Sequence, residues 1–268
     1  MSADAVLKGK VAIVLGAAGP GNMGQVIARY MSEAGANVVV AGRHADELER
    51  FAASIEGSSA VCDITNSQQL AELFGTTIER YGKVDIAINA TGWGLLKPFL
   101  ETTEEELERM QDLQFKGPFM FLQQAVRSME SGGSIIQISS ATASIMFENH
   151  AAYMGTKAGI DHVVRCVANE FGERGIRANS ISPGLTDTPM TAAAKEVPGV
   201  FDAFLKGYPL GRIGTSEDIA AAAVWLASDP CFMTGQNLQV NGGLTLRANP
   251  MQADINDAVE QAAQNSRR

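Results

Sequence analysis

The residues of this sequence that are best placed to do chemistry are Tyr153 and Lys157, four positions apart in the segment HAAYMGTKAGIDHVV. The apolar residues of the segment have helical spacing, so the phenol and the ammonium lie on one side, a turn apart. A free tyrosine titrates near ~10 and exchanges protons poorly at neutral pH. A nearby positive charge favours the phenolate, so we expect Lys157 to lower the pKa of Tyr153 into the range of acid–base catalysis. The alternative is a half-buried tyrosine and a solvated lysine on an ordinary amphipathic helix.

Short apolar segments alternate with helical segments along the chain as far as about residue 240. The apolar segments are nearly continuous and rich in Val and Ile, as strands covered on both faces must be. They span residues 10–16, 37–42, 58–62, 84–90, 134–139 and 176–182. Segments such as 23–35, 45–55 and 67–82 have apolar residues at spacings of three and four and end at a glycine. This alternation predicts one α/β domain with a doubly wound parallel sheet and helices on both faces.

The ends of this domain are less regular. We predict a catalytic domain over residues 1–243, with a substrate flap at about 185–212 that holds Pro189, Pro198 and Pro209. A C-terminal extension, 244–268, follows. Its last half forms one amphipathic helix or is disordered. The extension either crosses to a neighbouring subunit or covers a substrate entrance.

Composition excludes several classes of protein. The 268 residues are 46% hydrophobic and 19% charged, as in an ordinary globular protein with a substantial core. The net charge of −9 argues against binding to nucleic acid. No apolar run is long enough to cross a bilayer, and the N-terminus lacks the apolar core of a signal peptide, so we expect a cytoplasmic protein with no membrane partner. Cys62, Cys166 and Cys231 lack metal-ligand spacing, so we expect free, buried thiols and no metal site.

A glycine-rich turn, GAAGPGNMG, lies between the first strand and the first helix. Glycines allow a tight turn and a close approach of the backbone to a ligand. The start of the next helix presents free N–H groups and the positive end of its dipole, which suit a pyrophosphate. In this position the turn predicts a dinucleotide-binding site of the Rossmann type. The residues that would bind the cofactor here are Gly16, Gly19, Asn22, Met23 and Gly24.

The end of the second strand indicates which cofactor is bound. An acidic residue at this point would bind the ribose 2′-hydroxyl of NAD and repel the 2′-phosphate of NADP. The sequence instead reads Ala41-Gly42-Arg43-His44. Arg43 can hold a phosphate through charge-assisted hydrogen bonds, which favours NADP(H) over NAD(H). The alternative is that Arg43 only stacks on the adenine or is solvated.

With these motifs the chain resembles the short-chain dehydrogenase/reductase family over roughly residues 8–243. The motifs that agree in order and spacing are the glycine-rich turn, CDIT (62–65), NATG (89–92), ISSATAS (138–144), YMGTK (153–157), NSISPGLTDTP (179–189) and GRIGTSEDIAAAAVWLASD…TGQNLQVNGG. No single motif is specific, but the set is. The resemblance implies an NAD(P)(H)-dependent alcohol dehydrogenase or ketone reductase, which moves hydride between the nicotinamide and a carbonyl or secondary alcohol carbon.

The same resemblance assigns the catalytic roles. Tyr153 would be the general acid for carbonyl reduction or the base for alcohol oxidation, and Lys157 would lower its pKa and hold the nicotinamide ribose. Ser140, thirteen residues before Tyr153, would bind the substrate oxygen. Ser139 is the competitor. Because neighbouring strand residues point to opposite faces, we expect only one of the two serines to reach the site, and the spacing favours Ser140.

Further cofactor contacts follow from the resemblance. Asp63 and Ile64 would flank the adenine, and Asn89 would support the central strands. The cofactor cleft and the nicotinamide would be met by Ala90, Gly92, Pro183, Gly184, Thr186 and Thr188. Read without the family, Asp63 is a turn residue and Pro183-Gly184 is a plain turn.

The chain departs from the family pattern in two places. Its glycine-rich turn is two residues longer than usual, with Asn22 in the place of a glycine. Such a turn resembles that of divergent enoyl reductases, whose catalytic Tyr and Lys are further apart than here. Second, the family often has an Asn that holds a water for proton relay. At the corresponding place this sequence has Gln114, in the segment QFKGPF (114–119). Gln114 adds a methylene group, so we predict a shifted water or another relay. The alternative is that Gln114 is only a helix residue.

The substrate and the partners are less well defined by the sequence. A mostly apolar set of residues is expected to form the pocket wall, which favours a hydrophobic or aromatic ketone or alcohol over a sugar. The set is Trp93, Leu95, Ile145, Met146, Phe147, His150, Met190, Phe201, Phe204 and Tyr208. Two alternatives are a C=C (enoyl) reductase and a non-catalytic cofactor-binding protein. By resemblance we expect a homo-oligomer, a dimer or a homotetramer, assembled through helices at roughly 103–129 and 152–173 and the C-terminal strand.

Overall fold

The central element of the computed structural model, which describes residues 6–130 and 132–265, is a seven-stranded parallel sheet. Its strand order is β3-β2-β1-β4-β5-β6-β9, so the winding direction reverses between β1 and β4. The strands are β1 (Val11–Leu15), β2 (Asn37–Gly42), β3 (Ser58–Val61), β4 (Ile86–Asn89), β5 (Gly133–Ile138), β6 (Ile176–Pro183) and β9 (Asn237–Val240). The predicted doubly wound Rossmann fold is confirmed, and the six predicted strands are present. Ligands of such sheets bind at the carboxyl ends of the strands, near the reversal.

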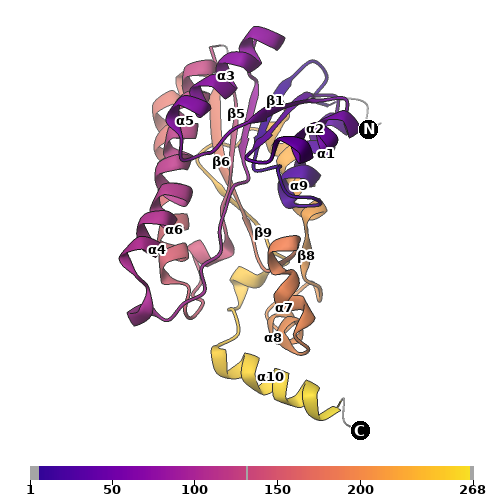
Figure 1. Cartoon of the computed structure of the whole chain (residues 1–268), viewed down its shortest axis with the longest axis vertical. Helices are drawn as coiled ribbons and strands as arrows, with labels where there is room; N and C mark the ends of the chain where they lie inside the picture. Colours follow the sequence, from indigo (N-terminus) through magenta and orange to yellow (C-terminus); the bar gives the residue numbers. More distant parts are fainter. Residues whose placement is uncertain (1–5, 131, 266–268) are drawn as a thin grey trace.

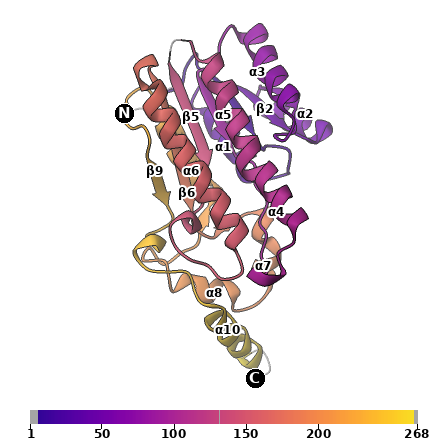
Figure 2. The same cartoon turned by 90° about the vertical axis from the view of Figure 1, so that its left-hand side faces the viewer.

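The sheet is buried on both faces because successive strand residues point to opposite sides. In β1, Val14 packs into the core on one side, while Ile13 and Leu15 pack into the core on the other. Helices α1 (Met23–Glu33), α2 (Ala45–Ser54) and α9 (Ser216–Ala227) cover the first side. Helices α3 (Ser67–Tyr81), α5 (Gly117–Ser128) and α6 (Ala151–Phe171) cover the second (Figures 1 and 2).

One long helix near the predicted range 103–129 is built from three pieces. Helix α4 (Glu104–Gln111) begins with a capping box formed by Thr103 and Glu106. A π-helical segment, Asp112–Lys116, then joins α4 to α5. Such a bulge turns the side chains that follow it and is frequent at functional sites. Gln114 lies inside this segment.

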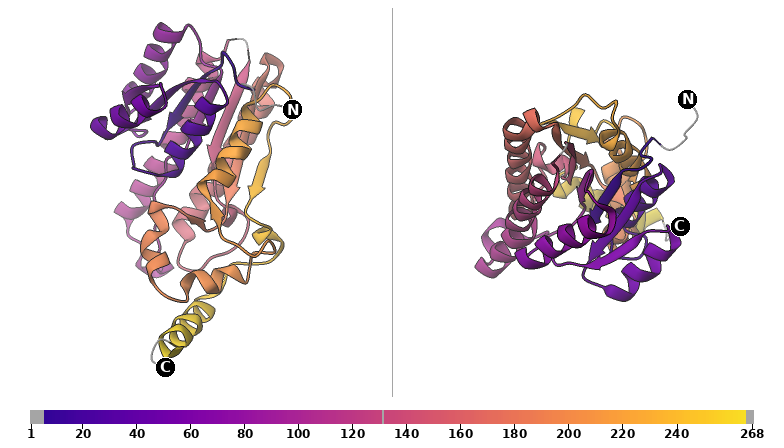
Figure 3. Two further views of the ribbon diagram at one scale, coloured as in Figure 1. Left: turned by 90° about the vertical axis from the view of Figure 1, so that its right-hand side faces the viewer. Right: turned by 90° about the horizontal axis from the view of Figure 1, so that it is seen from above.

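The flap and the tail form a separate layer beyond the carboxyl edge of the sheet (Figures 1 and 3). The flap contains β7 (Thr186–Asp187), α7 (Ala192–Glu196) and α8 (Val200–Leu205), and β7 pairs with β8 (Gly214–Thr215). The tail forms α10 (Gln252–Asn265), which lies against α8. Of the two states predicted for the last half of the tail, the structure has the helix.

The described residues contain no helix that is long and apolar enough to span a membrane. They also contain no group of three or more His, Cys, Asp and Glu side chains arranged to hold a metal ion. Cys62 and Cys231 are buried, but the expectation of burial was wrong for Cys166, which is exposed on α6. Val164 and Val167 turn toward the core, and helical geometry points the intervening Cys166 outward.

Candidate active site

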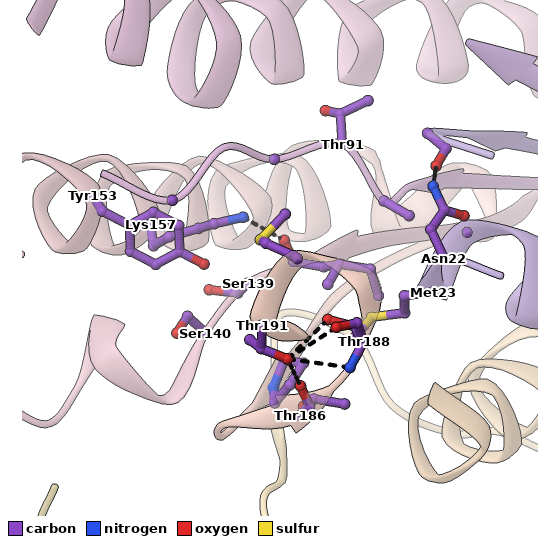
Figure 4. A pocket seen from close by; sticks show the side chains of 18 of the residues that line it. Asn22, Met23, Thr91, Ser139, Ser140, Tyr153, Lys157, Thr186, Thr188 and Thr191 are labelled. Carbon is purple, nitrogen blue, oxygen red and sulfur yellow. Dashed lines mark hydrogen bonds between the residues drawn. The ribbon is translucent and has the colours of Figure 1, made fainter. Parts of the chain in front are cut away.

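A cavity of about 620 Å³ lies at the carboxyl edge of the sheet, within the usual range for sites of small molecules. Its wall is formed by the loops that follow β1 to β6, by the flap, and by the first part of the tail. Figure 4 shows Asn22 and Met23 on one side of this cavity and Tyr153, Lys157 and Ser140 on another. Segments far apart in the sequence therefore meet at one site.

The glycine-rich turn is shaped by two positions where only glycine fits. Gly16 has a φ of +106°, and a Cβ atom there would lie 2.6 Å from the carbonyl carbon of Ala90. A Cβ atom on Gly24 would lie 2.5 Å from the carbonyl oxygen of Gly16. The backbone of the turn therefore packs directly against the start of α1 and the end of β4, in space that a side chain would otherwise fill. All five residues predicted for this turn line the cavity.

Asn22 stabilises the longer turn in place of the usual glycine. Its Oδ1 accepts a hydrogen bond from Gln25 N (2.9 Å), and its Nδ2 donates to Gly16 O (2.8 Å). Gln25, which the sequence interpretation missed, is buried and accepts a hydrogen bond from Gly21 N. Its Nε2 donates to Ala17 O and to Glu47 Oε1. The sequence signal for this role was a glutamine near the start of the first helix, because a buried amide there needs hydrogen-bond partners.

The part of the cavity next to the ends of β2 and β3, where the adenosine was expected, is lined by Arg43, His44, Asp63 and Ile64. Arg43 is exposed and forms no ion pair with any described residue. Asp63 accepts hydrogen bonds from the N and Oγ1 of Thr65, so it also shapes the local turn. The two interpretations of Asp63, turn residue and cavity residue, hold together.

The central strands contribute backbone and small residues to the cavity. Ala90 and Gly92 line it, whereas Asn89 lies behind the wall. Asn89 Nδ2 donates to Gln137 Oε1 (2.9 Å), and its Oδ1 accepts from Thr91 N and Thr91 Oγ1. This is the strand-supporting position expected for Asn89.

At the far end of the cavity Pro183, Gly184, Thr186 and Thr188 line the wall as predicted. Thr191, which was not predicted, holds this segment together. Its Oγ1 donates to Thr186 O (2.6 Å) and accepts a hydrogen bond from Thr188 N (3.2 Å). The sequence signal for this contact was the pair of threonines three residues apart, Thr188 and Thr191, which can form a capping box.

Tyr153 and Lys157 lie on α6 with their side chains at the same part of the cavity (Figure 4). The Lys157 ammonium is 5.5 Å from the centroid of the Tyr153 ring. Lys157 is buried, and its Nζ donates a hydrogen bond to Ile138 O (2.9 Å). The helix thus brings the pair together, while the end of β5 fixes where the ammonium points.

The expected lowering of the pKa of Tyr153 was wrong for the protein by itself. Burial raises the pKa of Tyr153 to about 12, with the Asp161 carboxylate adding to the rise and Ser140 opposing it. Burial also lowers the pKa of Lys157 to about 8, against a smaller upward effect of Asp161. Desolvation disfavours both charged forms, and it is the largest cause of both shifts. At neutral pH Tyr153 therefore carries its proton, as a general acid must.

The two neighbouring serines both border the cavity, contrary to the expectation that only one would reach it. Their hydroxyls nevertheless have different partners. Ser139 Oγ donates to Asp161 Oδ2 (2.8 Å), a group outside the cavity wall. Ser140 Oγ accepts from Thr142 N and lies 2.8 Å from Thr142 Oγ1. The Ser139 hydroxyl hydrogen is therefore committed to Asp161, whereas in the Ser140–Thr142 pair either hydroxyl can be the donor.

Gln114 does not line the cavity. It is buried in the π-helical segment, and its Nε2 points to Met110 Sδ (2.6 Å). Its Oε1 is buried without a hydrogen-bond partner, 3.5 Å from where a Cβ atom of Gly92 would be. The amide therefore lies directly behind the cavity wall, with an unused acceptor.

Among the predicted substrate residues, Phe147, His150, Met190 and Phe204 line the cavity. The His150 ring stacks on Tyr153, with ring centroids 4.3 Å apart, and Phe147 packs on Phe204 at 5.4 Å. His150 Nδ1 is 2.7 Å from Leu95 O, which can only accept, so Nδ1 carries the hydrogen. Burial lowers the pKa of His150, which keeps the ring neutral and leaves Nε2 as an acceptor.

Six other predicted wall residues lie outside the cavity lining: Trp93, Leu95, Ile145, Met146, Phe201 and Tyr208. The Trp93 ring instead packs on Arg109, whose guanidinium is 4.0 Å from the ring centroid. Tyr208 is buried under the flap, and its hydroxyl donates to Leu185 O (3.1 Å). Trp93 and Tyr208 are therefore used for packing on α4 and within the flap, and Met146 is exposed, which the pattern of apolar residues cannot reveal.

The tail contributes a residue that the sequence interpretation did not single out. Asn249 is buried and lines the cavity, and its Nδ2 donates to Met146 O (3.0 Å). Gln252 N then donates to Glu148 Oε2, and Ile255 packs in one cluster with Phe204. The tail therefore lies over the part of the cavity that Phe147 and Phe204 line, in its own chain.

Comparison with known proteins agrees with this geometry. Residues 16–245 match the family described as "Enoyl-(Acyl carrier protein) reductase". The chain is 37% identical over 247 residues to the 7alpha-hydroxysteroid dehydrogenase of Escherichia coli K12, covering 88% of this chain and 94% of that one. It is 32% identical to the D-threitol dehydrogenase of Mycolicibacterium smegmatis, covering 91% and 96%.

Solved structures give the same result. A short-chain type dehydrogenase/reductase from Mycobacterium ulcerans is similar with a TM-score of 0.88 at 30% identity, covering 94% of this chain and 98% of that one. A gluconate 5-dehydrogenase from Burkholderia cenocepacia J2315, solved with NADP and tartrate, has a TM-score of 0.87 at 26% identity, covering 92% and 100%.

Proposed function

We propose that this chain, which belongs to the short-chain dehydrogenase/reductase family and is an oxidoreductase, reduces the carbonyl group of a hydrophobic or aromatic ketone. In the reverse direction it oxidises the corresponding secondary alcohol. The observation that carries the proposal is the meeting of Ser140, Tyr153 and Lys157 at one cavity whose other end is a glycine-rich turn. The catalytic domain is assigned to residues 1–243, and 244–268 is the extension.

Each catalytic side chain has one task in this proposal. Tyr153 gives its proton to the carbonyl oxygen, and Ser140 donates a hydrogen bond to the same oxygen as charge develops on it. Lys157 supplies the positive charge that limits the cost of removing the tyrosine proton. The nicotinamide, when bound, supplies or accepts the hydride. Gln114, behind Gly92, is proposed to take part in a proton relay to solvent. If Gln114→Ala left turnover and its pH profile unchanged, Gln114 would have no such role.

The cavity fits a dinucleotide. The glycine-rich turn opens the N-terminus of α1 to a pyrophosphate, and Asp63 and Ile64 border the space for an adenine. We favour NADP(H) over NAD(H) because Arg43 is exposed at the cavity without an ionic partner among the described residues, at the position where a 2′-phosphate would lie. The relative solved with NADP is consistent with this choice.

Replacing Arg43 with alanine is expected to weaken NADPH binding by about 10- to 100-fold, because a charge-assisted hydrogen bond contributes about 1.5–3 kcal/mol. NADH has no 2′-phosphate and should bind as before. Dissociation constants measured by the fluorescence of the reduced cofactors test this expectation. Arg80→Ala removes an exposed guanidinium from α3 and is the matched control. Equal losses for NADPH and NADH would contradict the role of Arg43.

The proposed substrate is hydrophobic because Phe147, Met190 and Phe204 line its end of the cavity. His150 Nε2 and Asn249 add a small number of polar groups that would orient it. The named relatives act on molecules as different as a hydroxysteroid and D-threitol. The proposal of a hydrophobic substrate is therefore based on the residues of the cavity wall and not on the relatives.

The proposal is tested by the loss of NADPH or NADH absorbance with a panel of alicyclic ketones, aromatic ketones, sugars and enones, and by the reverse reaction with alcohols. We expect turnover of ketones in preference to sugars. Turnover of enones alone would favour C=C reduction, against which the Tyr153–Lys157 spacing argues. Cofactor binding without turnover of any compound would favour a binding protein.

Self-association is proposed through the helix formed by α4 and α5 and through α6. Phe115 and Phe119 are 38% and 39% exposed there, and self-association would cover these two aromatic side chains. Light scattering of the purified protein measures the mass in solution. A monomer at assay concentration would contradict this part of the proposal.

Detaching the tail is expected to weaken substrate binding without changing cofactor binding. Ile255→Asp places a charge in the buried contact between α10 and the flap. Burying this charge is unfavourable, so α10 should separate from α8 and leave the cavity uncovered. We expect the KM of the ketone to rise by about tenfold, as for the loss of about 1.4 kcal/mol of contacts. Ala253→Asp adds the same charge at an exposed position of α10 and should have no effect. Equal KM values in both variants would show that the tail is not a cover.

A further inference from the structure

A buried carboxylate lies one helical turn beyond Lys157 and has no role in the proposed reaction. Asp161 does not line the cavity. Its Oδ2 accepts hydrogen bonds from Ser139 Oγ (2.8 Å) and Asn237 Nδ2 (2.6 Å), while its Oδ1 is buried with no hydrogen-bond partner in the part of the chain that the structure describes. A carboxylate in such a place is expensive unless a positive charge compensates it.

Asp161 and Lys157 are fixed against the same point of the sheet. Lys157 Nζ donates to the carbonyl oxygen of Ile138, and Asp161 accepts from the hydroxyl of the next residue, Ser139. Residues four apart on a helix have Cβ atoms about 5–6 Å apart. The two charges therefore lie near each other in the interior, although no ion pair of 4.0 Å or less joins them.

The surroundings of Asp161 offer no other compensating charge. From the sheet, β5 supplies the hydroxyl of Ser139, β6 the hydroxyl of Ser180, and β9 the amide of Asn237. The titratable groups that interact with Asp161 among the described residues are Tyr153 and Lys157, both on α6. Lys157 is therefore the one cation that acts on this carboxylate in the described part of the chain.

We propose that Asp161 is a positioning residue of the active site, a buried counter-charge that holds Lys157 in its charged form beside Tyr153. The catalytic part of this inference rests on the proposed function, but the electrostatic effect of Asp161 on Lys157 does not. The carboxylate acts through Lys157 and does not touch the substrate. Asp161 also accepts the hydroxyl hydrogen of Ser139.

The direction of each effect follows from charge. Burial lowers the pKa of Lys157 and Asp161 opposes this, so removing the carboxylate should lower the pKa of Lys157 below about 8. The same carboxylate raises the pKa of Tyr153, so its removal lowers that pKa as well. Both changes move the alkaline limit of carbonyl reduction to lower pH.

The test is the titration of Lys157 in the full-length protein labelled with ¹³C at the lysine ε-carbons, with Lys157→Met to assign the resonance. In Asp161→Asn we expect Lys157 to titrate at least about one pH unit lower than in the wild type, a tenfold change in its proton affinity. The alkaline limb of ketone reduction should move in the same direction. An unchanged titration of Lys157 overturns the inference whether or not a substrate has been found.

A second pair of variants keeps the test valid if Asp161→Asn does not fold. Ser139→Ala removes a hydrogen bond that stabilises the carboxylate form of Asp161, so it should shift Lys157 in the same direction by a smaller amount. Ser134→Ala removes a similar buried hydrogen bond, to Leu226 O, from the other end of β5. If both alanine variants left the Lys157 titration where it is in the wild type, or shifted it equally, Asp161 would be only a structural anchor. Failure of the proposed function is a separate result, the absence of NADPH binding and turnover in the wild type.

Discussion

Replacing Tyr153 with phenylalanine is expected to lower the rate of ketone reduction by about 10²- to 10⁴-fold, the usual contribution of a positioned general acid. The variant loses one oxygen atom and keeps the ring that stacks on His150. Because the pKa of Tyr153 is raised to about 12, the group that is lost is a protonated phenol at neutral pH. NADPH binding and thermal stability should therefore change little.

Steady-state rates of NADPH oxidation measure this loss, with cofactor affinity and the thermal transition as controls. Tyr81→Phe removes a phenolic oxygen at the end of α3, where it contacts Ser58 Oγ, far from the cavity. It should retain wild-type turnover. If Tyr153→Phe retained near wild-type turnover in a folded protein, Tyr153 would not be the proton donor.

Replacing Lys157 with methionine is expected to remove activity and at the same time to stabilise the protein at neutral pH. Activity falls because the charge beside Tyr153 is lost, an effect we expect to be about 10²-fold or more. Stability rises because Lys157 must be buried in its charged form below its pKa. Its pKa falls from an ordinary value of 10.5 to about 8 on folding, which corresponds to about 3 kcal/mol. The unpaired Ile138 carbonyl left by the substitution costs about 1–3 kcal/mol, so the net gain should be at most about 2 kcal/mol.

The pH dependence gives this prediction its sign. The unfolded chain binds the Lys157 proton more tightly than the folded protein, so wild-type stability rises as pH increases from about 8 toward 10.5. The advantage of Lys157→Met should therefore be largest below about pH 8 and disappear toward pH 10.5. Urea unfolding at several pH values measures it. Lys116→Met, which removes an exposed ammonium, should show no such trend. A constant difference between Lys157→Met and the wild type across this range would mean that Lys157 is not buried as a cation.

The opposing effects of Lys157 show how the site differs from the rest of the core. Elsewhere the two faces of the sheet are packed with apolar side chains. At the carboxyl edge the chain buries an ammonium, a phenol and a carboxylate within a few residues of each other on α6. Such groups lower stability and are retained where chemistry requires them.

The fold and the part of the site that is local in the chain follow from the amino-acid pattern alone. Continuous Val and Ile runs such as those of β1 and β2 can only be strands covered on both sides, and their alternation with helices leaves one plausible architecture. Gly16 and Gly24 could be assigned because a tight turn before a helix has few solutions. Tyr153 and Lys157 could be paired because helical geometry fixes the relation between residues four apart.

The neighbours of the other side chains depend on how distant segments pack in the folded chain. Trp93 packs on Arg109 instead of the cavity, Gln114 lies behind Gly92, and Asn249 reaches the wall from the tail. None of these contacts is encoded in a local spacing, because each joins segments that come together only when the sheet, the flap and the tail pack. The direction of the Tyr153 pKa was also decided there. The sequence gives the distance between two charges along a helix, but the balance between their attraction and their desolvation depends on how much of the folded chain surrounds them.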